Sequence, residues 1–432
     1  MIDVTEGTDE VRVNDEGQLA APGADARRRR RLLWPALGVT VALNAAYGGI
    51  GGILLPAQVA LIDAGAKEVN LAIVMTTASL VTLVVSPLIG AASDRTRSPW
   101  GRRAPWILLG GLLAVPALLG LAAATTVAAL TVGWVVAQVL LNAVQAPMEA
   151  AVADRVLPLE RGRTGAFLTA GVALGLGIGV MVAGRLVSAP LTAALVVGVL
   201  VALAAATFVL VARTPGKGSA GSGAPSWPGV ARMVATLWVS PRRHPDFARV
   251  FTGRFVLVIG NQVISGYVLY ILMDYIGLPP ERAAASAGLY VSVHVACLGL
   301  AAAVSGRFSD LTGRRKPFVI GASFVVALGL AVPLVSPTPG ALLVYAVIAG
   351  LGRGVYAAVD TALMIDVLPS RADTGKDLAV LNLAQVLPQT LAPVVVAVLL
   401  ALAGGAYRVL FVFAIVMVLA STLVVARVRS VR

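Results

Sequence analysis

Long apolar runs follow one another along nearly the whole chain, separated by short stretches rich in charge, proline and glycine. Each run has about the 20 residues that a helix needs to cross a bilayer. Dividing the chain at the polar stretches predicts twelve membrane-spanning helices, at 33–62, 69–92, 105–124, 129–152, 165–186, 190–211, 250–274, 284–305, 317–336, 341–365, 378–400 and 405–426. The pattern therefore predicts an all-α membrane protein.

Composition narrows the possible functions. Of the 432 residues, 58% are hydrophobic and 13% are charged, whereas soluble domains have about 25% charged residues. Spans and short loops use almost the whole length, so no separate soluble catalytic domain fits. With one cysteine, Cys297, two histidines and no HExxH, GxSxG or Walker pattern, the sequence predicts no enzyme, no cofactor, no metal site and no nucleotide-driven pump.

The net charge of +13 is explained by membrane topology. Cytoplasmic loops are enriched in Lys and Arg. Of the 34 such residues, only Lys67, Arg185, Arg282 and Arg408 fall on one side of the membrane, and Arg353 lies within a span. We therefore expect a multi-pass protein of the plasma membrane, in particular a bacterial inner membrane, with both termini cytoplasmic. We expect the lipid bilayer as surroundings, no nucleic-acid partner and no obligate protein partner.

The breaks divide the chain six helices to six. Residues 1–31 are polar and acidic before an arginine run, which predicts a disordered cytoplasmic tail. Residues 213–248 contain TPGKGSAGSGAPSWPG and predict a flexible cytoplasmic linker. The two six-helix halves are expected at 32–212 and 249–428.

The two halves contain an internal repeat. GAASDRTRSPWGRRAPWIL, from Gly90, matches GRFSDLTGRRKPFVI, from Gly306, between the second and third helix of each half. AVADRVLP, from Ala151, similarly matches LMIDVLP, from Leu363, after the fourth helix. Shifts of 211 to 216 residues relate these pairs. A parallel repeat of this kind is typical of transporters in which one half rocks against the other around a central site.

The two loops resemble the signature loop of the major facilitator superfamily, and the resemblance covers all twelve spans. It implies the twelve-helix fold with pseudo-symmetric halves and alternating access. The longer first loop, with Thr96–Trp100 inserted, and GKDLAVLNLAQVLPQTLAP from Gly375 resemble the glycoside-pentoside-hexuronide cation symporters and the sucrose/proton cotransporter-like branch. This resemblance implies a secondary active transporter of a sugar or other small hydroxylated solute.

The charged residues of the repeated loops predict a cytoplasmic gate. Asp94 with the arginines that follow it has a counterpart in the second half, which suggests two latches that hold the outward-open state. Acids at the ends of the fourth and tenth helices, Glu149 and Asp360 among them, are the expected counter-charges. The predicted gate comprises Asp94, Arg95, Arg102, Arg103, Asp154, Asp310, Arg314, Arg315 and Asp366. Asp63 and Asp274 are expected at the opposite face, as solvent-side residues or extracellular gates.

Polar residues within the spans predict a substrate cavity, because such side chains are costly in contact with lipid. Three amides and an acid, Gln138, Asn142, Gln145 and Glu149, follow one another at intervals of 4, 3 and 4 and form a narrow stripe along one helix. Such stripes both donate and accept hydrogen bonds, which suits neutral hydroxylated ligands. The predicted cavity residues are Asn44, Tyr47, Gln138, Asn142, Gln145, Asn261, Gln262, Arg353, Tyr356, Asn382, Gln385 and Gln389. A purely structural role in joining neighbouring helices stays open for each of them.

His294, Glu149 and Asp360 are the candidates for ion coupling. His294 is expected near the bilayer midplane, where it could take up and release a proton during transport. The alternative is a neutral imidazole bonded to a neighbouring helix, and for the two acids an ion pair with loop arginines. The resemblance favours a coupling proton over sodium, because melibiose-type cation symporters place acids in helices 2 and 4, whereas the polar face of helix 69–92 offers only Ser79, Thr82 and Ser86.

Two other functions remain as alternatives. The first is a proton-coupled exporter of a drug or apolar metabolite. Drug/proton antiporters of the superfamily typically carry Gly-Pro in the fifth helix, whereas GVALGLGIGVMVAG from Gly171 has glycines that favour close helix packing. The second is a membrane sensor, although no signalling domain is attached.

Overall fold

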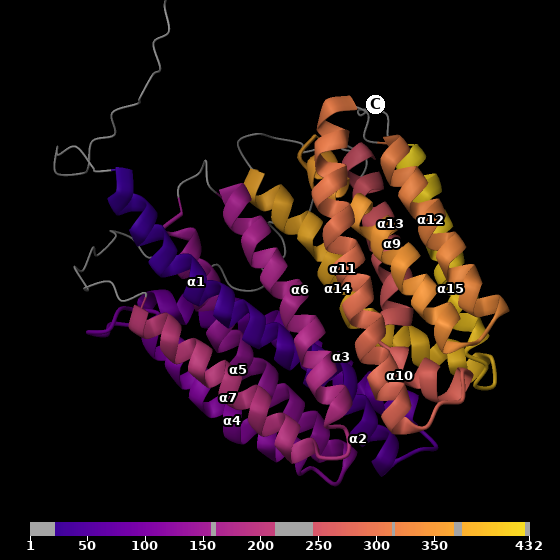
Figure 1. Cartoon of the computed structure of the whole chain (residues 1–432), viewed down its shortest axis with the longest axis horizontal. Coiled ribbons are helices and arrows are strands. Elements are labelled where there is room, and N and C mark those ends of the chain that lie inside the picture. The colour runs from indigo at the N-terminus through magenta and orange to yellow at the C-terminus, as the bar shows by residue number, and fades with distance from the viewer. Residues whose placement is uncertain (1–21, 157–160, 212–244, 313–315, 367–373, 428–432) are drawn as a thin grey trace, which may run out of the picture.

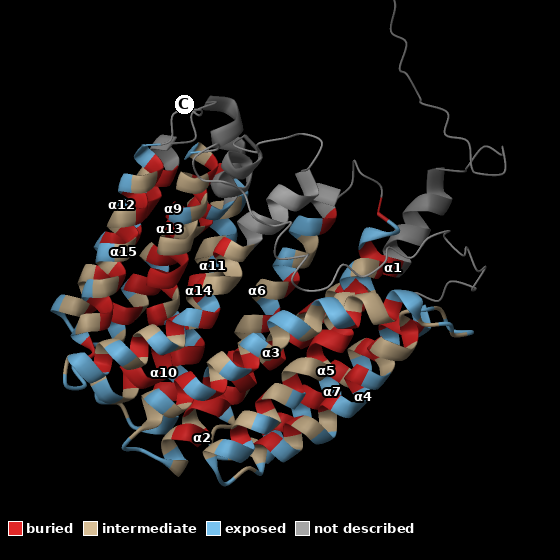
Figure 2. Ribbon diagram, turned by 180° about the vertical axis from the view of Figure 1, so that it is seen from behind, coloured by how far each residue is buried: buried red, intermediate tan, exposed pale blue. Residues whose placement is uncertain are grey.

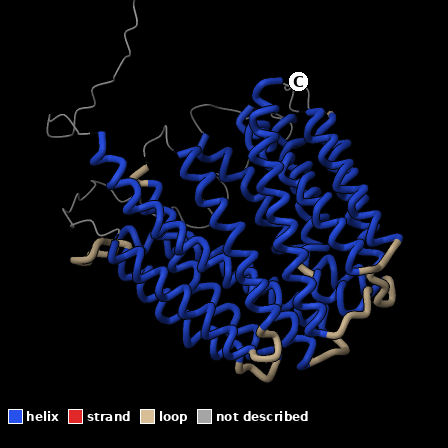
Figure 3. The backbone as a smooth tube through the Cα atoms, in the orientation of Figure 1, coloured by secondary structure: helices blue, strands red, loops and turns tan. Residues whose placement is uncertain are grey.

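The computed structural model describes residues 22–156, 161–211, 245–312, 316–366 and 374–427, with side chains described for 32–156, 164–211, 245–305, 319–357 and 383–427. Within these ranges the chain is helical apart from short loops and contains no strand (Figure 3). Eleven described helices are long and apolar enough to cross a membrane, and a shorter apolar stretch, Val319–Val335, supplies the twelfth. The prediction of an all-α protein with twelve spans is confirmed.

The helices follow the predicted spans closely. They are α1 (Pro22–Ala46), η1 (Tyr47–Leu54), α2 (Leu55–Ile62), α3 (Lys67–Arg95), α4 (Ala104–Ala122), α5 (Val127–Ala153), α6 (Arg161–Arg185), α7 (Pro190–Val211), α9 (Pro245–Ser265), α10 (Val268–Tyr270), η3 (Ile271–Tyr275), α11 (Pro280–Thr312), α12 (Lys316–Val335), α13 (Pro339–Asp366), α14 (Thr374–Leu402) and α15 (Arg408–Ala426). Most ends lie within a few residues of the expected ones, because charge, proline and glycine mark where a span leaves the membrane.

The structure differs from the prediction where the expected tail and the expected linker end, because a helix begins earlier than predicted at each place. Helix α1 begins at Pro22, inside the segment 1–31 that was expected to be disordered. Proline is well tolerated in the first turn of a helix, and the alanine and arginines that follow favour helix formation, so the span extends outward as a helix. Helix α9 likewise begins at Pro245, before the expected start of the second half. Residues 1–21 and 212–244 lie outside the described part of the chain.

Two spans are not regular α-helices. In the first, the sequence YGGIGGIL forms the π-helix η1 between α1 and α2. In the seventh, which was expected as one helix over 250–274, the chain breaks at Gly266 and Tyr267 and continues through α10 and the π-helix η3. Wider helical turns and broken helices recur at functional sites of membrane transporters. Ser265 and Gly266 interrupt the apolar run here, but the pair Ser305 and Gly306 lies within the unbroken helix α11, so the apolar pattern did not predict the break.

Helices α1 to α7 lie together, and α9 to α15 form a second group beside them (Figure 1). The groups converge at the end formed by residues 62–68, 266–280 and 403–408, here called the convergent end (Figures 1 and 2). They diverge toward the end formed by residues 95–103, 154–156 and 427, the divergent end. Helix pairs α6/α11 and α3/α14 join the two groups.

Helix α6 lies unusually close to helices of both groups. A Cβ atom added at Gly171 would lie 2.7 Å from the Leu37 side chain on α1, and one at Gly179 would overlap the carbonyl oxygen of Ala45. On another face of α6, a Cβ atom at Gly184 would lie 2.8 Å from the backbone oxygen of Ala284 on α11. The glycines of this helix therefore permit close backbone contact, as their spacing predicts.

Replacing Gly179 by alanine should lower the melting temperature of the purified protein. The added methyl group must push α6 away from α1, and overpacking of this kind costs about 1–3 kcal/mol. Gly120→Ala is the matched control, because a Cβ atom there meets nothing within 4 Å. Thermal unfolding in detergent measures both variants, and an unchanged melting temperature for Gly179→Ala would show that the two helices are not in close contact.

Candidate functional site

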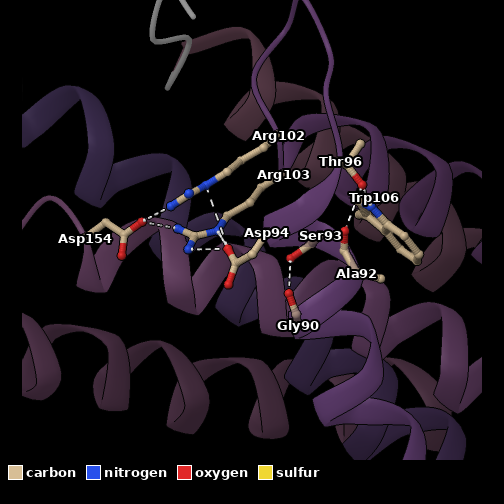
Figure 4. Close-up of polar contacts among 9 residues, drawn as sticks. All are labelled: Gly90, Ala92, Ser93, Asp94, Thr96, Arg102, Arg103, Trp106 and Asp154. Atoms are coloured by element: carbon tan, nitrogen blue, oxygen red, sulfur yellow. Dashed lines mark hydrogen bonds and ion pairs between the residues drawn. The ribbon is translucent and has the colours of Figure 1, made fainter. Parts of the chain in front are cut away.

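Four charged side chains at the divergent end form a compact network, here called the arginine cluster: Asp94, Arg102, Arg103 and Asp154 (Figure 4). Arg103 lies between the two acids, with Nη2 2.8 Å from Asp94 Oδ1 and Nη1 2.6 Å from Asp154 Oδ2. Arg102 Nη2 lies 3.0 Å from Asp154 Oδ2. The Arg103 side chain is only 10% exposed, whereas the other three are about half exposed. Arg103 therefore joins the ends of α3 and α5 through the loop before α4.

Hydrogen bonds within the loop hold its charged residues in place. Ser93 is fully buried and donates from Oγ to the carbonyl oxygen of Gly90. Trp106 Nε1 donates to Thr96 Oγ1 at 2.8 Å, which fixes the start of α4 against the end of α3 (Figure 4). Gly101 has a φ of +99°, a conformation that favours glycine in the turn before the two arginines. The loop thus presents the arginines to the acids of α3 and α5.

The predicted gate residues are only partly brought together. Asp94, Arg102, Arg103 and Asp154 meet, whereas Arg95 is exposed and takes no part in their ion pairs. The cluster lies within the first group of helices and is formed while the divergent ends are apart, so its formation does not require that end to close. Asp310, Arg314, Arg315, Asp360 and Asp366 lie outside the residues whose side chains are described.

Glu149, an expected counter-charge of the gate, is placed differently. Its Oε1 accepts a hydrogen bond of 2.8 Å from Gln145 Nε2, one turn earlier on α5. Gln145 Oε1 in turn accepts from the hydroxyl of Tyr47 at 3.0 Å, so Tyr47, Gln145 and Glu149 form a hydrogen-bonded chain from η1 to α5. Glu149 lies more than a turn before Asp154, and of these two acids of α5 and its end only Asp154 pairs with the arginines in the described part of the chain.

Other predicted cavity residues of the first half bond within their own helices. Asn142 Nδ2 donates to the carbonyl oxygen of Gln138, and Asn44 Nδ2 to that of Thr40. These bonds satisfy the amide donors without joining two helices. Within the described residues, Tyr47 and Gln145 are the members of this set whose side chains bond to each other between helices.

In the second half, Gln262 Oε1 accepts from Ser265 Oγ at 3.0 Å, close to the break between α9 and α10. Asn261 is buried, and its Nδ2 has no hydrogen-bond partner in the described part of the chain. Gln385 on α14 accepts from Arg254 on α9 at 3.4 Å. Of the remaining predicted residues, Tyr356 is buried, Gln389 is exposed, and Asn382 lies outside the described side chains.

Arg254 was missed by the analysis of the sequence. It lies within the membrane-spanning helix α9, yet counting charges by loop assigns it to the adjacent basic segment. Its position after a full turn of apolar and small residues, ARVFTGRFV, was the available signal. Arg254 and Arg353 thus both place a guanidinium group within spans of the second half.

His294 lies in a buried aromatic and basic cluster between α11 and α13. Its ring stacks on Tyr290 at 5.9 Å with an interplanar angle of 16°, and Tyr290 stacks on Tyr345 at 6.0 Å. Arg353 interacts electrostatically with both tyrosines and with His294, and it forms no ion pair within the described residues. Neither ring nitrogen of His294 has a hydrogen-bond partner of good geometry among those residues. His294 is not bonded to Asn261 or Gln262 on α9 in the described part of the chain.

A second polar network joins the two groups of helices at the convergent end. Lys67 Nζ on α3 lies 2.6 Å from Asp274 Oδ1 on η3. The hydroxyl of Tyr407, before α15, lies 2.7 Å from Glu68 Oε1 and 2.9 Å from Asp274 Oδ2. We call Lys67, Glu68, Asp274 and Tyr407 the clasp. Of these, sequence analysis singled out only Asp274 as a possible gate, because a tyrosine and two adjacent charges carry no recognisable pattern.

A family model and solved structures of known proteins match this chain. The model of the Major Facilitator Superfamily matches residues 37–293 and 250–432. A bacterial homologue of the human lysosomal transporter Spinster, in its inward-facing and occupied conformation, has a similar structure, with a TM-score of 0.65 over 92% of this chain and 94% of that chain at 13% identity. The same homologue, unoccupied, gives a TM-score of 0.61 over 94% and 96% at 13% identity. No curated protein matches this sequence.

In double-mutant cycles, Arg103 should show a larger coupling free energy with Asp154 than Arg102 does. Combining Arg103→Gln with Asp154→Asn should give a coupling of up to about 1 kcal/mol, the upper range for partly exposed pairs. The matched cycle with Arg102→Gln should give less, because Arg102 is half exposed. Unfolding in mixed micelles supplies the free energies, and equal couplings in the two cycles would contradict the geometry.

Proposed function

Because this chain belongs to the major facilitator superfamily and is a membrane transporter, we propose that it moves a small hydroxylated solute, such as a sugar, together with a proton. The observation that carries this proposal is the set of neutral donors and acceptors within the spans. The chain of Tyr47, Gln145 and Glu149 offers both kinds of group on one side. Gln262 and Gln385 offer further amides from α9 and α14.

Hydroxylated solutes suit such surroundings because each hydroxyl group both donates and accepts a hydrogen bond. A site that bonds these hydroxyl groups rejects an analogue that lacks them, because its own polar groups are then left without partners. The resemblance of the first signature loop and of the α14 sequence to the sugar and cation symporters supports the same class of solute. We therefore favour a sugar over an apolar drug or metabolite.

Alternating access accounts for the arrangement of the two groups of helices. They are joined at the convergent end and apart at the divergent end (Figure 1). The excess of arginine supports assigning the divergent end to the cytoplasm, and this assignment makes the conformation inward-facing. Solute would then bind from outside after the convergent end has opened.

His294 is the proposed coupling residue. It is buried, it has no hydrogen-bond partner of good geometry within the described residues, and Arg353 lies close enough to interact with it electrostatically. A histidine that lacks a partner in one conformation can gain one, and with it a proton, in another. Proton transfer at His294 during the conformational change would couple solute movement to the proton gradient.

Proteoliposomes with an inward proton gradient should accumulate a radiolabelled disaccharide, and a proton-conducting uncoupler should abolish the accumulation. Sugar hydroxyl groups have partners in the spans, whereas an apolar dye would leave those polar groups without partners. The same vesicles, loaded with a fluorescent dye, report export. Proton-driven dye movement without disaccharide uptake would overturn the proposed solute class and support the exporter.

Replacing His294 by glutamine should abolish accumulation but preserve downhill exchange of the same disaccharide, because the amide cannot carry the coupling proton. Ser292→Ala, on the same helix, is the matched control, since Ser292 Oγ bonds only to the carbonyl oxygen of Gly288 in its own helix. Uptake and exchange are measured in parallel. Accumulation at the level of the unmodified protein would exclude His294 from coupling.

A further inference from the structure

The clasp holds two carboxylates against a single hydroxyl group. Glu68 Oε1 and Asp274 Oδ2 both lie within hydrogen-bonding distance of the Tyr407 oxygen, at 2.7 and 2.9 Å. The two acids come from opposite groups of helices, so this arrangement exists only while the convergent end is closed. Tyr407 is 6% exposed, and the side chains of Lys67 and Asp274 are 13% and 29% exposed. The Tyr407 hydroxyl group is thus withdrawn from water, whereas Asp274 and Glu68 remain partly accessible.

Counting hydrogens shows that the clasp lacks one donor. A tyrosine hydroxyl group carries a single hydrogen and can donate it to one carboxylate only. Burial raises the pKa of Tyr407 above its ordinary value, as do its hydrogen bonds to Glu68 and Asp274, so the hydroxyl group keeps that hydrogen. Lys67 is directed at the other oxygen of Asp274. The second short oxygen–oxygen contact is therefore stabilised only if one carboxyl group is itself protonated and donates to the hydroxyl oxygen.

Among the described residues, the groups around the clasp do not supply the hydrogen-bond donor that it lacks. Lys67 Nζ lies 5.3 Å from the centre of the Tyr270 ring, whose hydroxyl group donates to the carbonyl oxygen of Pro56. The Tyr267 hydroxyl group donates to the carbonyl oxygen of Pro393. Asp63, the nearest further acid along the chain, accepts from Asn70 and from two backbone amides of its own turn.

The charged groups on the neighbouring helix starts are Glu281 and Arg282 on α11 and Arg408 on α15. All three are exposed, and none forms an ion pair with the clasp within the described residues. The clasp therefore holds two acids against one lysine, a net charge of −1 that one added proton would neutralise.

We propose that the clasp binds one proton when the convergent end closes, shared between Glu68 and Asp274 across Tyr407, and releases it when the halves part. The proton comes from the medium on that side: a carboxylate accepts it as the second acid approaches, and the carboxyl group returns it to water once the acids separate. The proposal adds to the proposed function a second proton site, at the face opposite the arginine-rich loops. It rests on the proposed alternating access, but not on the identity of the solute.

The proposal fixes the sign of a pH dependence. The closed form binds one more proton than the open form, so a fall in pH favours closure and a rise in pH favours opening. In the pH range where the closed form holds the proton and the open form does not, the ratio of closed to open molecules should change by up to tenfold per pH unit. Acidity on this side would thus drive the transporter toward the form that opens on the other side.

Distances between spin labels at Ala64→Cys and Pro279→Cys, in a Cys297→Ser background in lipid, test this without any solute. Pulsed electron paramagnetic resonance gives the closed and open fractions from about pH 5 to pH 9. We expect the closed fraction to fall as pH rises. Glu68→Gln should stay closed across this range, because the amide donates to Tyr407 without a bound proton.

Two further variants secure the interpretation. Tyr407→Phe removes the bridge and should also lose the pH dependence, whereas Asp63→Asn should retain it, because Asp63 bonds within its own turn. A closed fraction that does not change with pH in the unmodified labelled protein would overturn the proposal, as would an unchanged slope in both Glu68→Gln and Tyr407→Phe. If the protein takes up disaccharide but its closed fraction does not change with pH, only the clasp proposal is refuted. If the closed fraction changes steeply with pH but no disaccharide is taken up, only the solute class is refuted.

Discussion

Helix α6 can lie close to two other helices at once because glycines stand where its backbone approaches theirs. Gly171 and Gly179 meet α1, while Gly184 meets Ala284 on α11. In a bilayer, helix association depends on van der Waals contact and short interhelical bonds, since lipid tails compete for every apolar surface. Close backbone contact along α6 therefore stabilises both the first group of helices and its junction with the second.

The same contact explains how the junction could open. Small residues at a helix crossing permit sliding and separation without large side chains having to change rotamer. At the junction Gly177 and Gly184 of α6 lie against Ser292 and Ala284 of α11. The clasp at the membrane surface adds polar interactions between the two groups of helices. A surface network of charges responds to pH and to solvent, whereas the glycine contacts do not. Packing thus sets the geometry of closure, and the clasp adjusts its free energy.

The two halves differ in how many of the polar groups within their spans have hydrogen-bond partners. Tyr47, Gln145 and Glu149 form a continuous hydrogen-bonded chain in the first half. In the second half, the ring nitrogens of His294 have no hydrogen-bond partner of good geometry and the Nδ2 atom of Asn261 has none within the described residues. Unpaired polar groups are costly inside a membrane, and proteins retain them where function requires them. This difference is why we propose the coupling residue in the second half.

The sequence predicted the spans well because a single physical quantity, the length of an apolar run, decides where a helix can cross a bilayer. It also predicted that Asp94, Arg103 and Asp154 belong together, since repeated motifs revealed them. It did not reveal the break at Gly266, because a Ser-Gly pair also lies within the unbroken helix α11. Nor could it reveal the clasp, because Lys67 and Glu68 meet Asp274 and Tyr407 only when the two halves close, and no local pattern encodes that contact.

A reversible cross-link across the α6/α11 junction tests most directly whether that junction must open during transport. A Cβ atom at Gly177 on α6 would lie 3.5 Å from Ser292 Oγ on α11, so cysteines introduced at both positions should form a disulfide in the Cys297→Ser background. Oxidation should abolish disaccharide uptake, and reduction should restore it. Full uptake by completely cross-linked protein would contradict the account, because solute would then cross while the convergent end stays closed.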